Sequence, residues 1–99
     1  MIPGFEWDPA KRAANLRKHG IDFVDAVQLF EEFVLRVPDL RRPHGEARIV
    51  AIGTVAGKLL SVVYTPRGAS LRIISARRAN ARETRAYRAV RPPEAQEPD

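Results

Sequence analysis

Three apolar runs joined by very short connections constrain the fold of this chain most strongly. The runs are EARIVAIGTV, KLLSVVYTP and SLRIISA, and the connections between them are AG and RGA. Each run is rich in β-branched residues with a period of two, and each connection is short enough for a hairpin turn. The sequence therefore predicts an antiparallel meander over residues 46–76.

The turns decide which side chains share a face of this sheet. With Ala56 and Gly57 as the first turn, Arg48 faces Thr65; with residues 66–69 as the second, Val63 faces Arg72. The drier face, which we expect to pack on helices, carries Ala47, Ile49, Ala51, Leu60, Val62, Tyr64, Leu71, Ile73 and Ser75. The other face offers arginines and hydroxyl groups on a partly apolar floor and carries Arg48, Val50, Ile52, Leu59, Ser61, Val63, Thr65, Arg72 and Ile74.

Helix signals precede and follow the meander. Asp8 is a typical N-cap with Pro9 at the first helical position, and Gly20 ends that helix. A second helix starts at Asp22 and forms a hairpin with the first around HGID. Short strands are predicted in IPGFEW, before the first helix, and in FVLRVPDL, after the second. Asn80 and the glutamate three residues later form a capping box that starts a last helix.

These elements give an α+β fold with a short N-terminal strand, a helix hairpin, an antiparallel β-meander of three to four strands and a C-terminal helix. Ninety-nine residues with 44% hydrophobic content are enough for one core. We therefore expect one domain over residues 1–91, followed by a flexible acidic tail over residues 92–99. The absence of a long apolar run and of a signal-peptide pattern at the N-terminus predicts a cytoplasmic protein that contacts no membrane.

Cysteine and histidine counts limit the chemistry. The chain has no cysteine and two histidines, His19 and His44. Thiolate nucleophiles and the usual structural zinc sites are thereby excluded, and we predict no metal site and no cofactor.

Positive charge is concentrated in the second half of the chain. Residues 1–40 hold five Lys/Arg against seven Asp/Glu, residues 41–91 hold twelve against two, and residues 92–99 hold none against three. Nearly all the later cations are arginine, which suits planar, bidentate contact with phosphate. A polyanionic partner is one interpretation, and a solubilising surface is the other.

The stretches FEWDPAKRAANLRKHGIDFVDAVQLF, VAIGTVAGKLLSVVYTPRG and LRIISARRANARETRAY together resemble the BrnT family of toxins from type II toxin-antitoxin pairs. The resemblance implies a RelE-like fold and a ribonuclease activity that inhibits translation. It also implies a cognate BrnA-like antitoxin of the ribbon-helix-helix type, in a 2:2 heterotetramer that contacts operator DNA only through the antitoxin. The loop before the meander departs from the family pattern, because Gly45 stands in a serine position and Ala47 in a glutamate position.

Metal-independent RNA cleavage uses the ribose 2'-OH as nucleophile and needs a proton acceptor, a proton donor and cations for the developing charge. His44 is the best acid or base candidate, although a histidine in a Pro-Gly loop is more often a solvated turn residue. Arg48, Arg72 and Arg77 are the candidates for stabilising the phosphate and the transition state. Tyr64 is expected in the core instead.

Further cations are candidates for RNA contact. Lys11, Lys18 and His19 share one face of the first helix with Asn15, and arginines recur along the last helix. The predicted nucleic-acid-binding residues are Lys11, Lys18, His19, Lys58, Arg67, Arg78 and Arg82. A non-catalytic basic nucleic-acid-binding module and a purely structural partner protein remain the alternatives, because solvated faces explain the same spacing.

Overall fold

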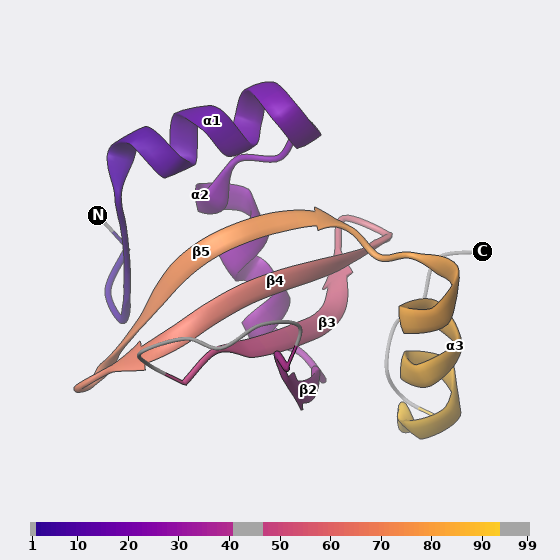
Figure 1. The fold of residues 1–99 in the computed structure, drawn as a ribbon. Helices are drawn as coiled ribbons and strands as arrows, with labels where there is room; N and C mark the ends of the chain where they lie inside the picture. The colour runs from indigo at the N-terminus through magenta and orange to yellow at the C-terminus, as the bar shows by residue number, and fades with distance from the viewer. Residues whose placement is uncertain (1, 41–46, 94–99) are drawn as a thin grey trace.

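A five-stranded sheet organises the part of the chain that the structure, a computed structural model, describes: residues 2–40 and 47–93. The strands lie in the order β1-β5-β4-β3-β2 (Figure 1). Their bounds are β1 Phe5–Trp7, β2 Leu35–Pro38, β3 Ile49–Val55, β4 Lys58–Arg67 and β5 Ser70–Arg78. The helices are α1 Pro9–His19, α2 Phe23–Ala26, the 3-10 helix η1 Val27–Glu31 and α3 Ala81–Val90.

The predicted mixed α+β architecture is confirmed. Strands β2 to β5 form a four-stranded antiparallel meander, and β1 adds to the outer edge of β5 in the parallel direction. Strand β2 is the opposite edge of the sheet. No helix in the described ranges is long and apolar enough to cross a membrane.

The first hairpin turn is confirmed and the second is wrong. Val55 pairs with Lys58, as a turn at Ala56 and Gly57 requires. At the second turn, however, Arg67 pairs with Ser70, so β4 runs two residues farther than predicted. Gly68 explains the tighter turn, because its φ of 57° is a conformation that glycine adopts at little cost.

A bulge in β5 changes the face assignment along that strand. Tyr64 pairs with Ile73 but Val63 pairs with Ser75, so Ile74 is an extra residue in β5. Beyond the bulge the alternation is inverted, so, contrary to the prediction, Ser75 does not lie on the drier face. It lies on the face that carries Arg48 and Arg72, which we call the arginine face. Arg77, opposite Ser61, joins the same face.

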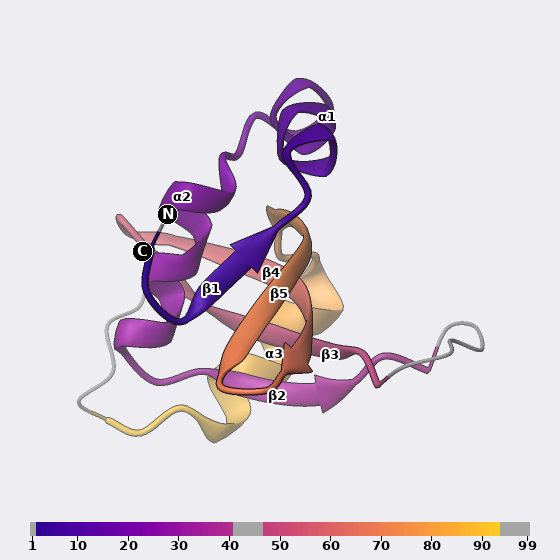
Figure 2. The ribbon, with the colours of Figure 1, turned by 90° about the vertical axis from the view of Figure 1, so that its left-hand side faces the viewer.

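Helices α1, α2 and η1 pack on the drier face, as predicted (Figures 1 and 2). Phe23 and Leu29 are fully buried there, and Trp7 stacks edge-on against Phe23 with 6.0 Å between ring centroids. The second helix is one α-turn continued by η1 and not a full helix. The sheet residues of this core are Ala51, Leu60, Val62, Tyr64, Ile73 and Ala76.

The opposite face is less open than predicted, because α3 and the segment before β2 cover part of it. Tyr87 of α3 is 1% exposed and packs with Val50, Ile52, Leu59 and Val63 in a second core. Its ring lies 5.7 Å from that of Phe33, between centroids. The hydroxyl residues Ser61 and Thr65, expected on an accessible floor, are each 1% exposed. The arginines border this buried floor.

The predicted helix ends are confirmed. The Asp8 carboxylate accepts a hydrogen bond from the backbone N of Ala10, and Gly20 ends α1 with a φ of 71°. Asn80 and Glu83 form the capping box of α3. Residues 94–99 of the predicted tail lie outside the described residues.

Candidate nucleic-acid interface

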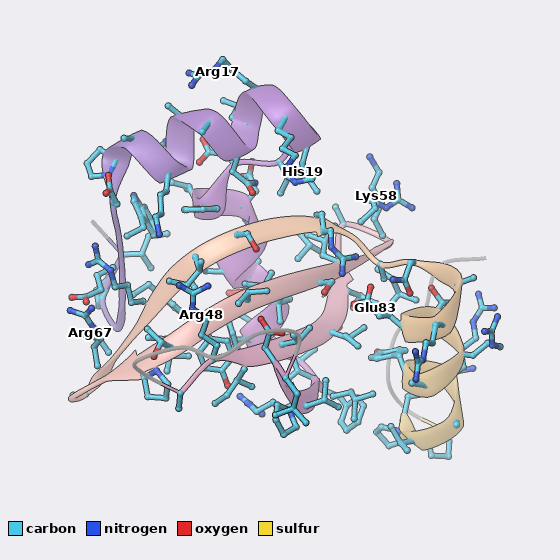
Figure 3. The ribbon with its side chains drawn as sticks, in the orientation of Figure 1. Arg17, His19, Arg48, Lys58, Arg67 and Glu83 are labelled. Carbon is cyan, nitrogen blue, oxygen red and sulfur yellow. The ribbon has the colours of Figure 1, made fainter. Side chains whose placement is uncertain are left out.

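Arg48 and Arg72 flank Thr65 on one face of the sheet. Thr65 pairs with Arg72 across β4 and β5, and its hydroxyl donates to the carbonyl oxygen of Ala47, directly before Arg48. Two strand spacings separate the backbones of the arginines by about 10 Å. In Figure 3, Arg48 lies over the sheet between Arg67 at one end and Glu83 beside α3.

Arg48 carries a buried donor without an acceptor. Its Nε is excluded from solvent and has no hydrogen-bond partner among the described residues. Buried polar atoms are almost always paired, because an unmet donor costs about 1–3 kcal/mol. The Nε of Arg48 is thus an unmet donor among residues 2–40 and 47–93, and phosphate oxygens are acceptors that guanidinium groups match well.

Arg72 is only weakly paired. Its cross-strand neighbour on β1 is Glu6, and the distance from Arg72 Nη1 to Glu6 Oε1 is 3.4 Å, longer than a good charged hydrogen bond. Both side chains are about one-third exposed, so solvent screens the pair. Within residues 2–40 and 47–93, this long contact is the one side-chain partner of Arg72.

Arg77, in contrast, is held by a carboxylate. Its Nη1 and Nη2 donate to Oε1 and Oε2 of Glu83 at 2.8 and 2.9 Å. Glu83 also accepts from the Ser61 hydroxyl at 3.1 Å and from the Asn80 backbone N at 2.9 Å. Burial raises the pKa of Glu83, but the hydrogen bonds from Arg77, Asn80 and Ser61 together outweigh it, and the pKa is lowered.

Sequence reasoning missed this role of Glu83. The capping-box spacing correctly placed its side chain at the start of α3, but only the bulge in β5 brings Arg77 to that position. Along β4, Arg77 lies opposite Ser61 and Arg72 opposite Thr65, about 13 Å apart. The three predicted catalytic arginines hence share a face, but Arg77 stands apart from the other two.

A groove separates β2 from α3 beside Arg77. Its volume is about 640 Å³, and Arg82 lines it together with Arg77. Its other lining residues are Leu35, Val37, Pro38, Asp39, Leu40, Val50, Ile52, Asn80, Glu83 and Ala86. We call it the α3 groove.

A second cleft of about 380 Å³ brings together three predicted binding residues, His19, Lys58 and Arg78. They come from the end of α1, the start of β4 and the end of β5, and Figure 3 shows His19 and Lys58 on this side of the molecule. Asp22 and Asp25 also line the cleft, so its charge is mixed. Within the described residues, no group of three or more His, Asp or Glu side chains is arranged to hold a metal ion.

The predicted shared face of α1 is not one exposed surface. Lys11 and Lys18 are exposed, but Asn15 between them is only 6% exposed. The Asn15 amide donates to the carbonyl oxygens of Ala76 and Ile21, and its oxygen accepts from Ala76 N. This face is buried at its centre because Asn15 pairs with the backbone N–H and C=O groups of Ala76, at the part of the β5 edge that β1 does not reach.

The remaining predicted residues lie elsewhere. Arg67 is exposed at the end of β4, far from Glu83 in Figure 3. His44, the predicted acid or base, falls outside the described residues.

Comparison with known proteins identifies the family of this chain. The family model described as "Ribonuclease toxin, BrnT, of type II toxin-antitoxin system" matches residues 7–83, from the end of β1 to the first turn of α3. No curated protein matches the chain. The matched region contains Arg48, Arg72 and Arg77 and covers more than half of the chain. The chain therefore belongs to the BrnT family of ribonuclease toxins.

Proposed function

We propose that this chain is a metal-independent endoribonuclease whose cleavage of RNA inhibits translation. The observation that carries the proposal is the pair Arg48 and Arg72, which flank Thr65; among the described residues the Arg48 Nε has no acceptor, and Arg72 is held only by a long ion pair with Glu6. Guanidinium groups of this kind pair well with the phosphates of an RNA backbone in charge and in hydrogen bonding.

In the proposed reaction, the ribose 2'-OH attacks the adjacent phosphorus. The 2'-OH gives its proton to a base, the bond from phosphorus to the 5'-oxygen breaks, and that oxygen takes a proton from an acid. A cyclic 2',3'-phosphate and a free 5'-OH result. Arg48 and Arg72 stabilise the negative charge that grows on the phosphoryl oxygens, and His44 is the proposed acid or base.

Arg77 has a different proposed role. Because Glu83 already neutralises it, Arg77 adds little net charge for a phosphate to meet. Its fixed guanidinium would instead orient RNA at the edge of the arginine face, next to Arg82 and the α3 groove.

The family implies a protein antitoxin as partner. We propose that this partner is a BrnA-like protein of the ribbon-helix-helix type in a cytoplasmic 2:2 heterotetramer, and that the toxin domain spans residues 1–91 with a RelE-like fold. The meander and the helix pair on one face support that fold assignment.

One observation favours the alternative, a basic module that binds RNA without cleaving it. Among the described residues, neither His19 nor Tyr64 serves the arginine pair: His19 lines the other cleft, and the Tyr64 hydroxyl accepts from Arg36 Nε at 3.1 Å. The proposed catalysis therefore relies on another proton acceptor, for which His44 is our candidate.

Cleavage in the presence of a chelator tests the proposal. Purified chain, free of antitoxin, is incubated with RNA in EDTA, and products are examined for cyclic phosphate ends. We expect cleavage with such ends and inhibition of translation in a cell-free system. RNA that is retarded on a gel in a strongly salt-dependent way but stays intact would favour the binding module, and cleavage that stops with EDTA would contradict metal independence.

A further inference from the structure

The α3 groove exposes apolar side chains at the edge of the sheet. Its floor is formed by Leu35 and Ile52, and its rim includes Val37 and Leu40, which are 37% and 84% exposed. Strand β2, which carries Val37, pairs with β3 on one side only. Apolar side chains exposed together in a concave site are typical of a surface that binds another molecule.

The positive charge open to a ligand at this groove lies on α3. Among the described lining residues, Glu83 is paired with Arg77, and Asp39 also has a partner. Arg82 is exposed on the α3 wall and has no partner among residues 2–40 and 47–93. Arg85, one turn farther along the helix, is exposed as well. A ligand for the groove therefore needs apolar groups with negative charge beside them.

The lining of the groove distinguishes protein from RNA. Proteins bind unpaired bases mainly by stacking them on aromatic rings, and the described residues that line the α3 groove include no aromatic side chain. Aliphatic side chains such as Val37 and Ile52 instead match the apolar face of a peptide segment. A volume of about 640 Å³ is within the range that accommodates a few side chains.

We propose that the α3 groove is the docking site for a segment of the antitoxin, which places aliphatic side chains along Val37 and Leu40 and carboxylates on Arg82 and Arg85. The proposal rests on the pairing with an antitoxin and not on the cleavage chemistry. A segment docked here lies against Arg77, on the same face as Arg48 and Arg72. Docking would block RNA from one end of the arginine face.

Binding of the adjacent gene product tests the proposal. The protein encoded next to this chain's gene is titrated into purified chain carrying Val37→Asp or Arg82→Glu. The controls are Leu16→Asp and Arg17→Glu on α1, which place the same changes at exposed positions of another element. We expect each groove variant to raise the dissociation constant about tenfold or more. The dissociation constant of each control should stay within about twofold of the wild-type value.

Four results would overturn the proposal. The first is a Val37→Asp variant that binds the adjacent gene product like the wild type, and the second is a wild-type chain that does not bind it at all. The third is loss of RNA affinity instead of partner affinity in Val37→Asp. The fourth is that Val37→Asp no longer weakens partner binding in a chain that ends at Pro93, which would identify the chain's own acidic tail as the occupant.

Ribonuclease activity of the antitoxin-free variants is measured in parallel. We expect Val37→Asp to cleave RNA like the wild type, because Val37 lies on β2 at the edge of the sheet, whereas Arg72 lies on β5 and Arg48 directly before β3. If the wild-type chain fails to cleave RNA while the groove variants still lose the partner, the proposed catalysis fails and the docking site stands.

Discussion

Replacing Glu83 by glutamine separates the charge of this side chain from its shape. Glu83 accepts two hydrogen bonds from Arg77, one from Ser61 and one from the Asn80 backbone. Hydrogen bonds to a charged group contribute about 1.5–3 kcal/mol each before screening, and glutamine presents an amide NH₂ to one of the Arg77 donors. Because the Arg77 side chain is 30% exposed, solvent reduces the loss, and we expect Glu83→Gln to lower the free energy of unfolding by about 2 kcal/mol.

Urea denaturation at several pH values measures this effect. Folding lowers the pKa of Glu83, so its charge stabilises the fold fully above the unfolded-state pKa of about 4.3. That stabilisation is lost as pH falls through the lower folded-state pKa. The gap between wild type and Glu83→Gln should thus be full at pH 7 and shrink below about pH 4.

An exposed carboxylate provides the control. Glu31→Gln, at the end of η1, should change stability by less than about 0.5 kcal/mol. A Glu83→Gln variant as stable as Glu31→Gln, or a stability gap that persists unchanged at pH 3, would refute the assigned role of the Arg77 pair.

Two further predictions concern how the helices are held on the sheet. Asn15→Ala removes three hydrogen bonds, two buried ones to Ala76 and a partly buried one to Ile21, and should cost about 2–4 kcal/mol in urea denaturation, whereas Leu16→Ala, at a 46% exposed position, should cost much less. Equal losses for the two variants would contradict the role of the Asn15 hydrogen bonds in holding α1 on the sheet. Tyr87→Ala removes the side chain that packs α3 on the sheet and should lower stability by about 3–5 kcal/mol in thermal denaturation, with 52% exposed Val90→Ala as control. A loss under about 1 kcal/mol for Tyr87→Ala would show that α3 is held by other contacts.

Much of the fold could be predicted because local signals and hydrophobic patterning agree. Asp8 and Gly20 limit α1, Asn80 caps α3, and the two-residue turn after Val55 sets the register of β3 with β4. These features depend on neighbours in the sequence, so a single chain reveals them.

The errors arose where contacts between distant segments decide the structure. Nothing in the local pattern marks Ile74 as an extra residue, yet this bulge puts Arg77 on the arginine face. Tyr87 covers the arginine face only because α3 packs back onto the sheet there. The periodicity of the sequence does not predict where that helix packs. Asn15 has the spacing of an exposed helix position, and only its bonds to Ala76 show that it is buried.

The candidate site was predictable in composition more than in geometry. Arginine enrichment from residue 41 favoured a polyanionic partner, with a solubilising surface as the alternative. The alternation of side chains placed Arg48 and Arg72 on one face, and the two-residue error at the second turn left that assignment unchanged. The pairing of Arg77 with Glu83, which separates a neutralised arginine from two available ones, required the folded chain.

Cleavage kinetics of arginine variants test the central claim most directly. RNA is incubated in EDTA with antitoxin-free wild type, Arg48→Ala, Arg72→Ala and Arg17→Ala, the last at an exposed position of α1 away from the arginine face. Loss of one transition-state donor typically lowers the rate about 10²–10³-fold. We predict that loss for Arg48→Ala and for Arg72→Ala and wild-type cleavage for Arg17→Ala; Arg48 and Arg72 variants that cleave as fast as Arg17→Ala would contradict the account.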